Sequence, residues 1–260
     1  AGASGGADGT GAAARFFWPQ GLALDAAGAN LYVADTNNHA IRKVALASGA
    51  VTTFAGAAGQ PGSADGTGAA ARFNAPSGVA VDKNGNLYVA DTDNATLRLV
   101  TPGGVVSTLA GLAGSVGAAD GTGAAARFNH PNAVAVDQAF NVYVTDTDNH
   151  TVRKVTSALG VVTTMAGQAG ASGSADGVGS IARFNSPAGI AVSAAGDLFV
   201  ADTDNSTVRS AGVPAAPVIT TQPQGQSVTA GAGFTLTVKA TGRPAPTYQW
   251  QLNGAAIVNA

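Results

Sequence analysis

Aspartate and arginine recur together at a fixed spacing. Four glycine- and alanine-rich segments, the first reading ADGTGAAARF at residues 7–16, place an arginine seven residues after an aspartate. A guanidinium forms paired hydrogen bonds with a carboxylate or a phosphate, so a ring of these arginines on one face could bind a carboxylate, a phosphate or an acidic sugar. The alternative, favoured by the identical spacing in every copy, is that each aspartate and arginine fix their own loop. The arginines are Arg15, Arg72, Arg127 and Arg183, after Asp8, Asp65, Asp120 and Asp176.

A second aspartate and a second arginine recur in the same register. The aspartate ends an apolar segment such as LYVAD at residues 31–35, where its side chain commonly accepts backbone N–H groups of a turn. In three copies this aspartate is the first residue of an Asp-x-Asp-Asn pattern, which offers oxygen ligands for calcium. The chain, however, has no glutamate and no EF-hand spacing. We expect structural turns at these aspartates, and we expect the arginines to pack between neighbouring repeats: Asp35, Asp91, Asp146 and Asp202, with Arg42, Arg98, Arg153 and Arg209.

The three histidines do not predict a zinc site. His39 and His150 occupy the same position in two copies, and His130 stands beside Pro131 at another position. Zinc needs ligands that converge on one point, which this distribution does not offer, and the chain has no cysteine. No Ser-His-Asp constellation for nucleophilic catalysis can be picked out, because serines and aspartates are plentiful in the chain. We therefore expect no cofactor, with calcium or zinc unsupported, and we assign no catalytic residue.

Residues that differ between the copies are the candidates for ligand recognition. Around one recurring proline the copies read Trp-Pro-Gln, Ala-Pro-Ser, His-Pro-Asn and Ser-Pro-Ala. Shared positions build the repeat, so positions that differ are free to shape a binding surface; the alternative is tolerated loop variation. The candidates are Trp18, Gln20, His130 and Asn132.

Composition narrows the class of protein. The 260 residues include 36 glycines and 15 acidic residues, all of them aspartate, which argues against a helical protein. The net charge of −2 gives no electrostatic reason to expect nucleic acid or an anionic membrane as a partner. No apolar run approaches the ~20 residues of a membrane helix. We therefore expect no nucleic acid and no membrane insertion.

A fourfold repeat supplies the elements that position these residues, with copies over about 1–56, 57–112, 113–168 and 169–212. The second copy predicts strands over 78–82, 87–90, 96–100 and 105–110, joined by tight turns such as Asn84-Gly85. Both faces of residues 87–90 are apolar, so each small sheet needs cover on both sides. Four-stranded sheets stacked radially as β-propeller blades provide it, and the fold class is all-β.

The repeats resemble those of the NHL-repeat β-propeller family. The strings PQGLALDAAGANLYVADTNNHAIRKV (19–44) and HPNAVAVDQAFNVYVTDTDNHTVRKV (130–155) carry its Asn-His pair before an (Ile/Val)-Arg-Lys strand, a pair that becomes Asn94-Ala95 and Asn205-Ser206 elsewhere. Such propellers usually have six blades. The resemblance therefore implies an incomplete six-bladed propeller, an open arc without two upstream blades and the closing strand; the fourth copy also lacks its last strand.

The composition changes after residue 212. We expect a linker over 213–217 and then the N-terminal half of a domain over 218–260, with an alternating strand at 234–238. This part resembles an immunoglobulin-like β-sandwich, which implies that Trp250 is the core tryptophan and that Val238 stands where many members have a bridging cysteine. Half a sandwich exposes its core and an unpaired edge.

Together the resemblances imply a binding or scaffolding module of a secreted or cell-surface bacterial protein, with a protein, peptide or carbohydrate ligand on one propeller face. The alternative is a metal-dependent lactonase- or lyase-like enzyme with its site in the channel. That alternative needs carboxylates and histidines from different blades to converge there. The innermost-strand aspartates Asp25, Asp82 and Asp137 instead fall in the first hairpin turn, away from the mouth that carries Trp18. RNA binding would need a basic face, which near-neutral repeats do not offer.

Overall fold

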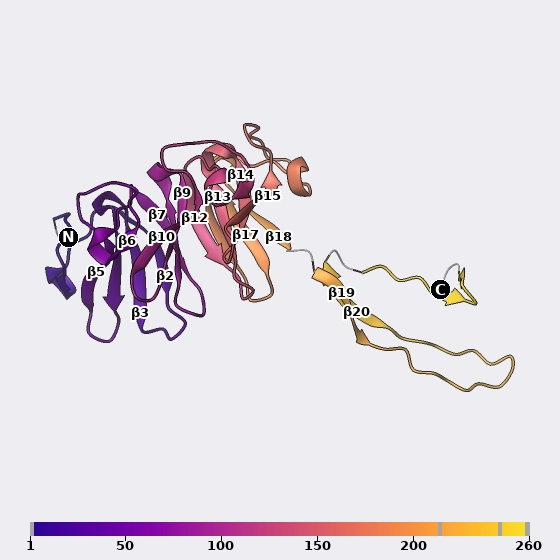
Figure 1. Cartoon of the computed structure of the whole chain (residues 1–260). Coiled ribbons are helices and arrows are strands. Elements are labelled where there is room, and N and C mark those ends of the chain that lie inside the picture. Colours follow the sequence, from indigo (N-terminus) through magenta and orange to yellow (C-terminus); the bar gives the residue numbers. More distant parts are fainter. Residues whose placement is uncertain (1–2, 213–214, 244–245, 258–260) are drawn as a thin grey trace. The chain divides into compact units, whose positions relative to one another are not determined.

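The computed structural model describes residues 3–212, 215–243 and 246–257. The chain divides into two compact units, Ala1–Ser210 and Ala211–Ala260 (Figure 1). The first unit is a row of antiparallel sheets, and the helices described in it are single 3-10 turns within loops. No helix of the described residues is both long enough and apolar enough to cross a membrane.

The sheets are propeller blades, as the sequence predicts. Three have five strands, and in the first blade the order is β1-β5-β4-β3-β2. Its strands are β1 (Gly9–Thr10), β2 (Pro19–Leu24), β3 (Asn30–Asp35), β4 (Ala40–Ala45) and β5 (Ala50–Gly56). The second blade contains β6 (Gly66–Thr67), β7 (Pro76–Val81), β8 (Leu87–Asp91), β9 (Thr96–Val100) and β10 (Val105–Gly111). The third contains β11 (Gly121–Thr122), β12 (Pro131–Val136), β13 (Asn141–Asp146), β14 (Thr151–Thr156) and β15 (Val161–Gly167).

The structure adds a short fifth strand to the four that the sequence predicts in each of these three blades. The glycine-rich segment that carries Asp65 adds a two-residue strand outside β10, where Gly66 pairs with Val106 and Thr67 with Val105. A 3-10 turn follows at Gly68–Ala70, and equivalent turns follow β1 and β11. The fourth blade has three strands, namely β16 (Pro187–Val192), β17 (Asp197–Asp202) and β18 (Thr207–Gly212).

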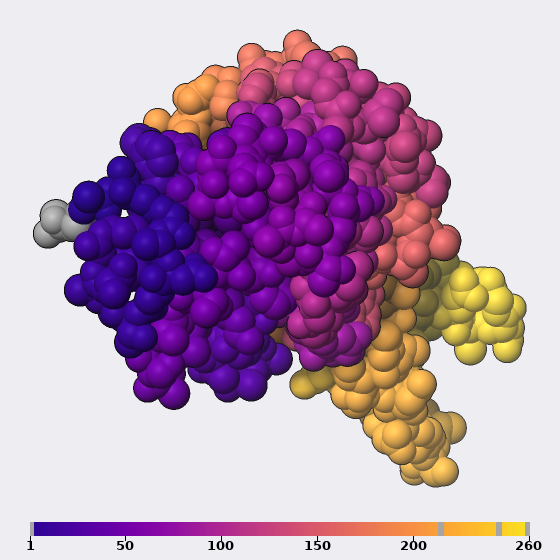
Figure 2. Space-filling view, turned by 60° about the vertical axis from the view of Figure 1, so that its left-hand side comes forward, coloured from indigo at the N-terminus to yellow at the C-terminus, as the bar shows by residue number. Residues whose placement is uncertain are grey.

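Successive blades meet along their innermost strands. Strand β2 packs against β7, and β7 packs against β12, which packs against β16. A Cβ atom on Gly78 would lie 2.3 Å from the carbonyl oxygen of Asn132, and one on Gly21 would lie 2.4 Å from that of Ser77. The backbones therefore touch, and a side chain at either position would force the blades apart. The residue colours pass in order from indigo to magenta around this body (Figure 2).

The apolar core lies between blades. Phe73, which precedes β7, is fully buried and packs with Ile41 and Ala55 of the first blade and with Leu87 of its own. Phe128 has the same place between the second and third blades. Burial of such a ring removes a large apolar area from water, so these contacts stabilise the stack of blades.

Hydroxyl groups add a hydrogen bond from each blade to the next. The Oγ1 atoms of Thr36, Thr92 and Thr147 donate to prolyl carbonyl groups at the start of the following innermost strand, at 2.8, 2.8 and 2.7 Å. These threonines begin the 3-10 turns η2 (Thr36–Asn38), η4 (Thr92–Asn94) and η6 (Thr147–Asn149).

The described residues of the second unit form two small antiparallel sheets. Strand β19 (Ala215–Thr221) pairs with β20 (Lys239–Arg243), and β21 (Gln251–Leu252) pairs with β22 (Ala255–Ala256). The predicted strand at 234–238 is wrong, because β20 begins only at Lys239, which pairs with Thr221 at the end of β19. Residues before Lys239 would have to pair beyond Thr221, where Pro223 has no N–H group to extend the ladder. Of the predicted linker, residues 213 and 214 lie outside the described residues and 215–217 belong to β19.

Candidate functional site

One end of the blades carries the variable residues that flank the recurring proline. The residue directly before each innermost strand has a left-handed backbone, with φ of 56° at Trp18, 49° at Ala75, 51° at His130 and 50° at Ser186. Left-handed backbone is unfavourable for residues other than glycine, so the surrounding loops must hold it. The four blades thus present four different side chains from the same backbone position.

His130 lies between two aspartates from different blades. Its Nδ1 atom is 2.6 Å from Oδ2 of Asp148 in the third blade, and its Nε2 atom is 3.7 Å from Oδ1 of Asp93 in the second. All three side chains are about half exposed. The imidazole and the two carboxylates, which come from two blades, therefore form one solvent-accessible polar cluster.

Among the described residues, the other three variable candidates make no hydrogen bond or ion pair with that cluster. Trp18 is 68% exposed, which is high for a residue that can bury a large apolar area. Gln20 is exposed on β2. Asn132 is half-buried on β12, and its carbonyl oxygen accepts a hydrogen bond from Oγ of Ser77 at 2.7 Å. The backbone of Asn132 thus joins two blades.

The arginines of the glycine-rich segments donate to their own loops. In the second blade Nη1 of Arg72 donates to the carbonyl oxygens of Ala69 and Ala71 at 2.6 and 2.7 Å, and Nη2 donates to Oε1 of Gln60 at 2.9 Å. Contacts with nearby carbonyl groups recur at the other arginines of this series, which are Arg15, Arg127 and Arg183.

The aspartates seven residues before these arginines have different partners from the one that their spacing suggests. Asp65 pairs with Arg98 at 2.7 Å, not with Arg72. The same exchange occurs in every blade, where the pairs are Asp8 with Arg42, Asp120 with Arg153 and Asp176 with Arg209. The sequence could not show this, because strand pairing brings together residues 33 or 34 positions apart.

Each strand arginine is the centre of a buried network. In the second blade Nη1 of Arg98 donates to Oδ2 of Asp91 at 2.8 Å and to the carbonyl oxygen of Arg72 at 2.9 Å. Its guanidinium lies 5.2 Å from the ring centroid of Phe73, within cation–π range. Arg98 and Asp91 are fully buried, and the same contacts recur around Arg42, Arg153 and Arg209.

The strand-ending aspartate accepts hydrogen bonds from a more distant segment than a simple turn would supply. Oδ1 of Asp91 accepts the N–H of Asn74, 17 residues earlier, and Oδ2 accepts Nδ2 of Asn94. The turn at Asp91 is therefore tied to the segment that enters β7. Burial raises the pKa of Asp91 to about 6, while hydrogen bonds from Asn94, the Asn74 N–H and Arg98 act in the opposite direction. Asp35, Asp146 and Asp202 accept the equivalent bonds.

The two histidines of the Asn-His pairs join blades through their rings. Nδ1 of His39 accepts the N–H of Ala75 at 3.0 Å, and Nδ1 of His150 accepts the N–H of Ser186 at 3.1 Å. Each ring thus holds the left-handed residue that enters the next blade. Within the described ranges, no three or more His or Asp side chains are arranged to hold a metal ion.

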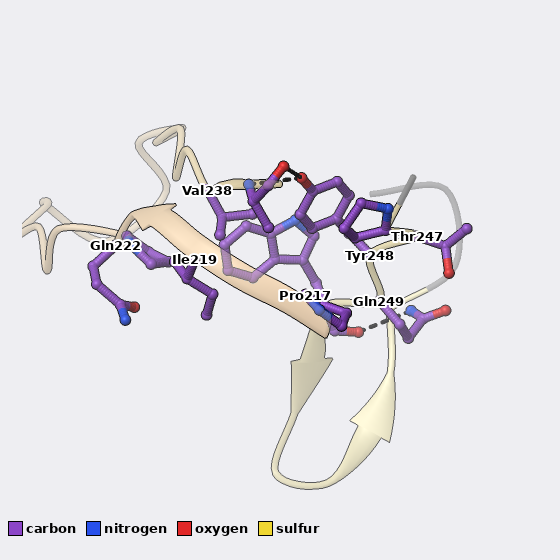
Figure 3. A pocket seen from close by; sticks show the side chains of 11 residues that line it. Pro217, Ile219, Gln222, Val238, Thr247, Tyr248 and Gln249 are labelled. Atoms are coloured by element: carbon purple, nitrogen blue, oxygen red, sulfur yellow. Dashed lines mark hydrogen bonds between the residues drawn. The ribbon is translucent and has the colours of Figure 1, made fainter. Parts of the chain in front are cut away.

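A pocket of about 380 Å³ lies within the second unit (Figure 3). Trp250, which the immunoglobulin resemblance makes the core tryptophan, lines it together with Val238, Ile219 and Tyr248. The hydroxyl of Tyr248 accepts the N–H of Ala240 at 2.9 Å, which fixes the ring against β20.

Sequence reasoning missed Asp93 and Asp148 as neighbours of His130. Their signal was present, because both occupy the third position of the Asp-x-Asp-Asn pattern, and this position differs in the first copy, which has Asn37. It also missed the inter-blade role of Thr36, Thr92 and Thr147, although a threonine follows the strand aspartate in every copy.

Family models match both parts of the chain. An NHL repeat matches residues 16–44, 73–98, 128–155 and 184–209, and an immunoglobulin domain matches residues 216–260. Among curated proteins, the chain is 32% identical over 180 residues to NHL repeat-containing protein 2 of Bos taurus, covering 65% of this chain and 25% of that protein. It is 29% identical over 202 residues to Protein SUPPRESSOR OF QUENCHING 1, chloroplastic, of Arabidopsis thaliana, covering 74% of this chain and 19% of that protein.

Solved structures agree in fold. A Bacteroides thetaiotaomicron protein of unknown function superposes with a TM-score of 0.62 at 26% identity, covering 74% of this chain and 46% of that one. An auxiliary nutrient binding protein of Bacteroides ovatus superposes with a TM-score of 0.60 at 24% identity, covering 76% of this chain and 48% of that one. This chain thus spans about half the length of these structures and at most a quarter of the curated relatives named above. With four in-register repeats, four blades and a matching segment after them in the sequence, the chain belongs to the NHL-repeat β-propeller family and carries an immunoglobulin-domain segment on the C-terminal side of the repeats.

Proposed function

We propose that the blades form a non-catalytic binding module whose glycan, peptide or protein ligand lies on the face that carries Trp18, Gln20, His130 and Asn132. One observation carries the proposal: four equivalent left-handed positions hold their backbone alike but present Trp18, Ala75, His130 and Ser186. A constant backbone that presents a different side chain from each blade is typical of a recognition surface.

The chemistry of this face suits a ligand with both apolar and polar groups. Trp18 offers an exposed ring for stacking, and His130 with Asp93 and Asp148 offers hydrogen-bond donors and acceptors. Binding is also a use to which related folds are put, since the Bacteroides ovatus structure is described as an auxiliary nutrient binding protein. At 24% identity that likeness supports the fold, and the argument for binding rests on the residues of this chain.

The predicted setting belongs to the same proposal. An immunoglobulin-domain match that follows the repeats in the sequence supports an extracellular or cell-surface position. A further blade beside β2, as a six-bladed ring would have, is supported by Leu22 and Leu24 of β2, which are exposed, whereas the residues equivalent to Leu22 in the next two blades, Val79 and Val134, are buried.

The test is binding by the whole chain on glycan and peptide arrays, repeated with the double variant Trp18→Ala/His130→Ala. We expect the strongest ligand to bind the double variant at least tenfold more weakly. Leu159→Ser, which changes an exposed apolar residue at the other end of the blades, should bind as the parent does. Binding that survives the double variant, or arrays that detect no ligand, would contradict the proposal.

A further inference from the structure

A second pocket, of about 240 Å³, lies at the opposite end of the blades from His130. The placement follows from the strands: Ala75 and His130 precede β7 and β12, whereas the pocket is built from the turns that follow these strands. It lies where the second and third blades meet. Its lining residues are Asp82, Asn84, Asn86, Tyr88 and Leu99 of the second blade with Phe140 and Ser157 of the third.

Phe140 has an unfavourable backbone in this turn. Its φ is 64°, and the equivalent residues of the other blades are all glycine, Gly28, Gly85 and Gly196, with φ of 66°, 82° and 86°. Glycine adopts this conformation at no steric cost, whereas a bulky residue there is a genuine outlier. A strained residue that replaces glycine in one blade alone is a feature that the fold does not require.

Other departures from the repeat converge on the same pocket. Leu99 stands where the first and third blades have Lys43 and Lys154. Ser157 stands where the first two blades have Leu46 and Pro102. Asn84 stands where the other three blades have alanine, at residues 27, 139 and 195. Four of the seven lining residues are thus specific to this one seam between blades.

The lining residues that recur in other blades are held by hydrogen bonds within their turn. Asp82 accepts the N–H groups of Asn84 and Asn86 at 2.8 and 2.9 Å, Nδ2 of Asn86 at 3.0 Å and the hydroxyl of Tyr88 at 3.1 Å. Its carboxylate is therefore fully used by the turn. Desolvation raises the pKa of Tyr88 to about 12, so its hydroxyl stays protonated at neutral pH.

Lys83 ties Phe140 to the neighbouring blade. Its Nζ atom lies 4.5 Å from the centroid of the Phe140 ring and 3.3 Å from the carbonyl oxygen of Gln138, which it can reach as a donor. The ammonium group is therefore engaged within the protein. In the part of the chain that the structure describes, the Asn84 side chain makes no hydrogen bond with another protein group, and it faces the pocket as a free amide.

We propose that this pocket binds a single sugar ring or a polyol of similar size. The ring of Phe140 and the side chain of Leu99 supply apolar surface for C–H groups, and Asn84, Asn86 and Ser157 supply amide and hydroxyl groups for its hydroxyls. An anion is disfavoured, because the nearby Lys83 ammonium is engaged with Gln138 and Phe140 and because the acidic side chain of Asp82 lines the pocket. The site is separate from the face that carries Trp18 and His130.

The test is a titration of the whole chain with methyl glycosides of glucose, galactose and mannose, followed by amide ¹H–¹⁵N NMR. We expect at least one glycoside to give saturable shifts at Asn84, Asn86, Phe140 and Ser157, with no shift at Trp18 or His130. Phe140→Gly and Asn84→Ala each restore the residue of other blades, so both variants should fold, and each should weaken binding at least tenfold. Ala27→Ser changes the equivalent turn of the first blade and should leave binding unchanged.

Two outcomes would overturn the proposal. One is the absence of saturable shifts in this pocket with all three glycosides. The other is binding that Phe140→Gly and Asn84→Ala both leave unchanged while their thermal unfolding shows that they are folded. Neither outcome bears on the Trp18 and His130 face, whose test uses different variants.

Discussion

The third and fourth blades contain the same aspartate–arginine network in different surroundings. Nη1 of Arg153 lies 2.7 Å from Asp146 in the third blade, and Nη1 of Arg209 lies 2.9 Å from Asp202 in the fourth. Arg153 is fully buried, whereas Arg209 is 15% exposed, because no strand of the described residues pairs outside β18. The local sequence thus determines the contacts, and the neighbouring strands determine the dielectric environment and hence their energy.

The largest expected difference between these blades comes from their arginines. Arg153→Met leaves two carboxylates and two carbonyl groups without their donor, and the carboxylate of Asp146 is fully buried, so we expect a loss of about 4 to 5 kcal/mol in the free energy of unfolding. Arg209→Met should cost about 1 to 2 kcal/mol, because water reaches its site. Urea unfolding of both variants measures this. Equal losses would show that burial does not set the energy of the network.

The phenylalanines beneath the arginines are the next test. Phe128 is fully buried in a large cluster shared by the second and third blades, and Phe128→Ala should cost about 3 to 4 kcal/mol. Phe184 packs in a smaller cluster with Val152, Ala182 and Val200, so Phe184→Ala should cost about 2 kcal/mol. The same urea measurement compares them. A greater loss for Phe184→Ala would contradict the order.

The hydroxyl bonds between blades offer a smaller contrast. Oγ1 of Thr147 donates to the carbonyl oxygen of Pro187 in the next blade, whereas Oγ1 of Thr203 reaches only the carbonyl oxygen of Ala201 in its own blade, at 3.4 Å. Thr147→Val should lower the free energy of unfolding by about 1 kcal/mol, and Thr203→Val by less than about 0.5 kcal/mol. Thermal unfolding with matched heating rates separates these values, and indistinguishable variants would argue against the inter-blade bond.

The smallest contrast is the pH dependence at the outer aspartates. Desolvation raises the pKa of Asp120, but hydrogen bonds from Thr164 and Arg153 outweigh it and lower the pKa below 3.8. The unfolded chain then binds this proton more readily, so the stabilisation is complete above pH 3.8 and is lost as the pH falls through the folded-state pKa.

Asp120→Asn should therefore cost less than about 1 kcal/mol at pH 7, since Asp120 is half exposed, and nothing at a pH below that folded-state pKa. Asp176, which is 95% exposed, should give a smaller change when replaced by asparagine. Unfolding of each variant and its parent across this pH range gives the difference. A cost that persists unchanged in acid would show that the side chain stabilises the blade without its charge.

The sequence predicted the strands better than the contacts between them. The turns at Asn84-Gly85 and after Val100 were recognisable because glycine, proline and asparagine mark them locally. The pairing of Asp65 with Arg98 was not, because Arg72 is nearer in sequence and the true partner lies across the sheet. The strained turn at Phe140 was visible in principle, since the four copies align and only this one lacks glycine. A role for this turn could be proposed only from the pocket, because the pocket forms where two blades meet.

The contact between innermost backbones sets the curvature of the arc. With Gly78 touching the backbone of Ala133, and Gly21 touching that of Gly78, the blades reach their closest possible spacing along this line. Each contact limits how closely two successive innermost strands can approach, and it therefore helps to set the angle between their blades. A larger residue at either glycine would act as a wedge that changes this angle, and with it the radius of the arc. The number of blades that close a ring is thus governed in part by one small residue in each innermost strand.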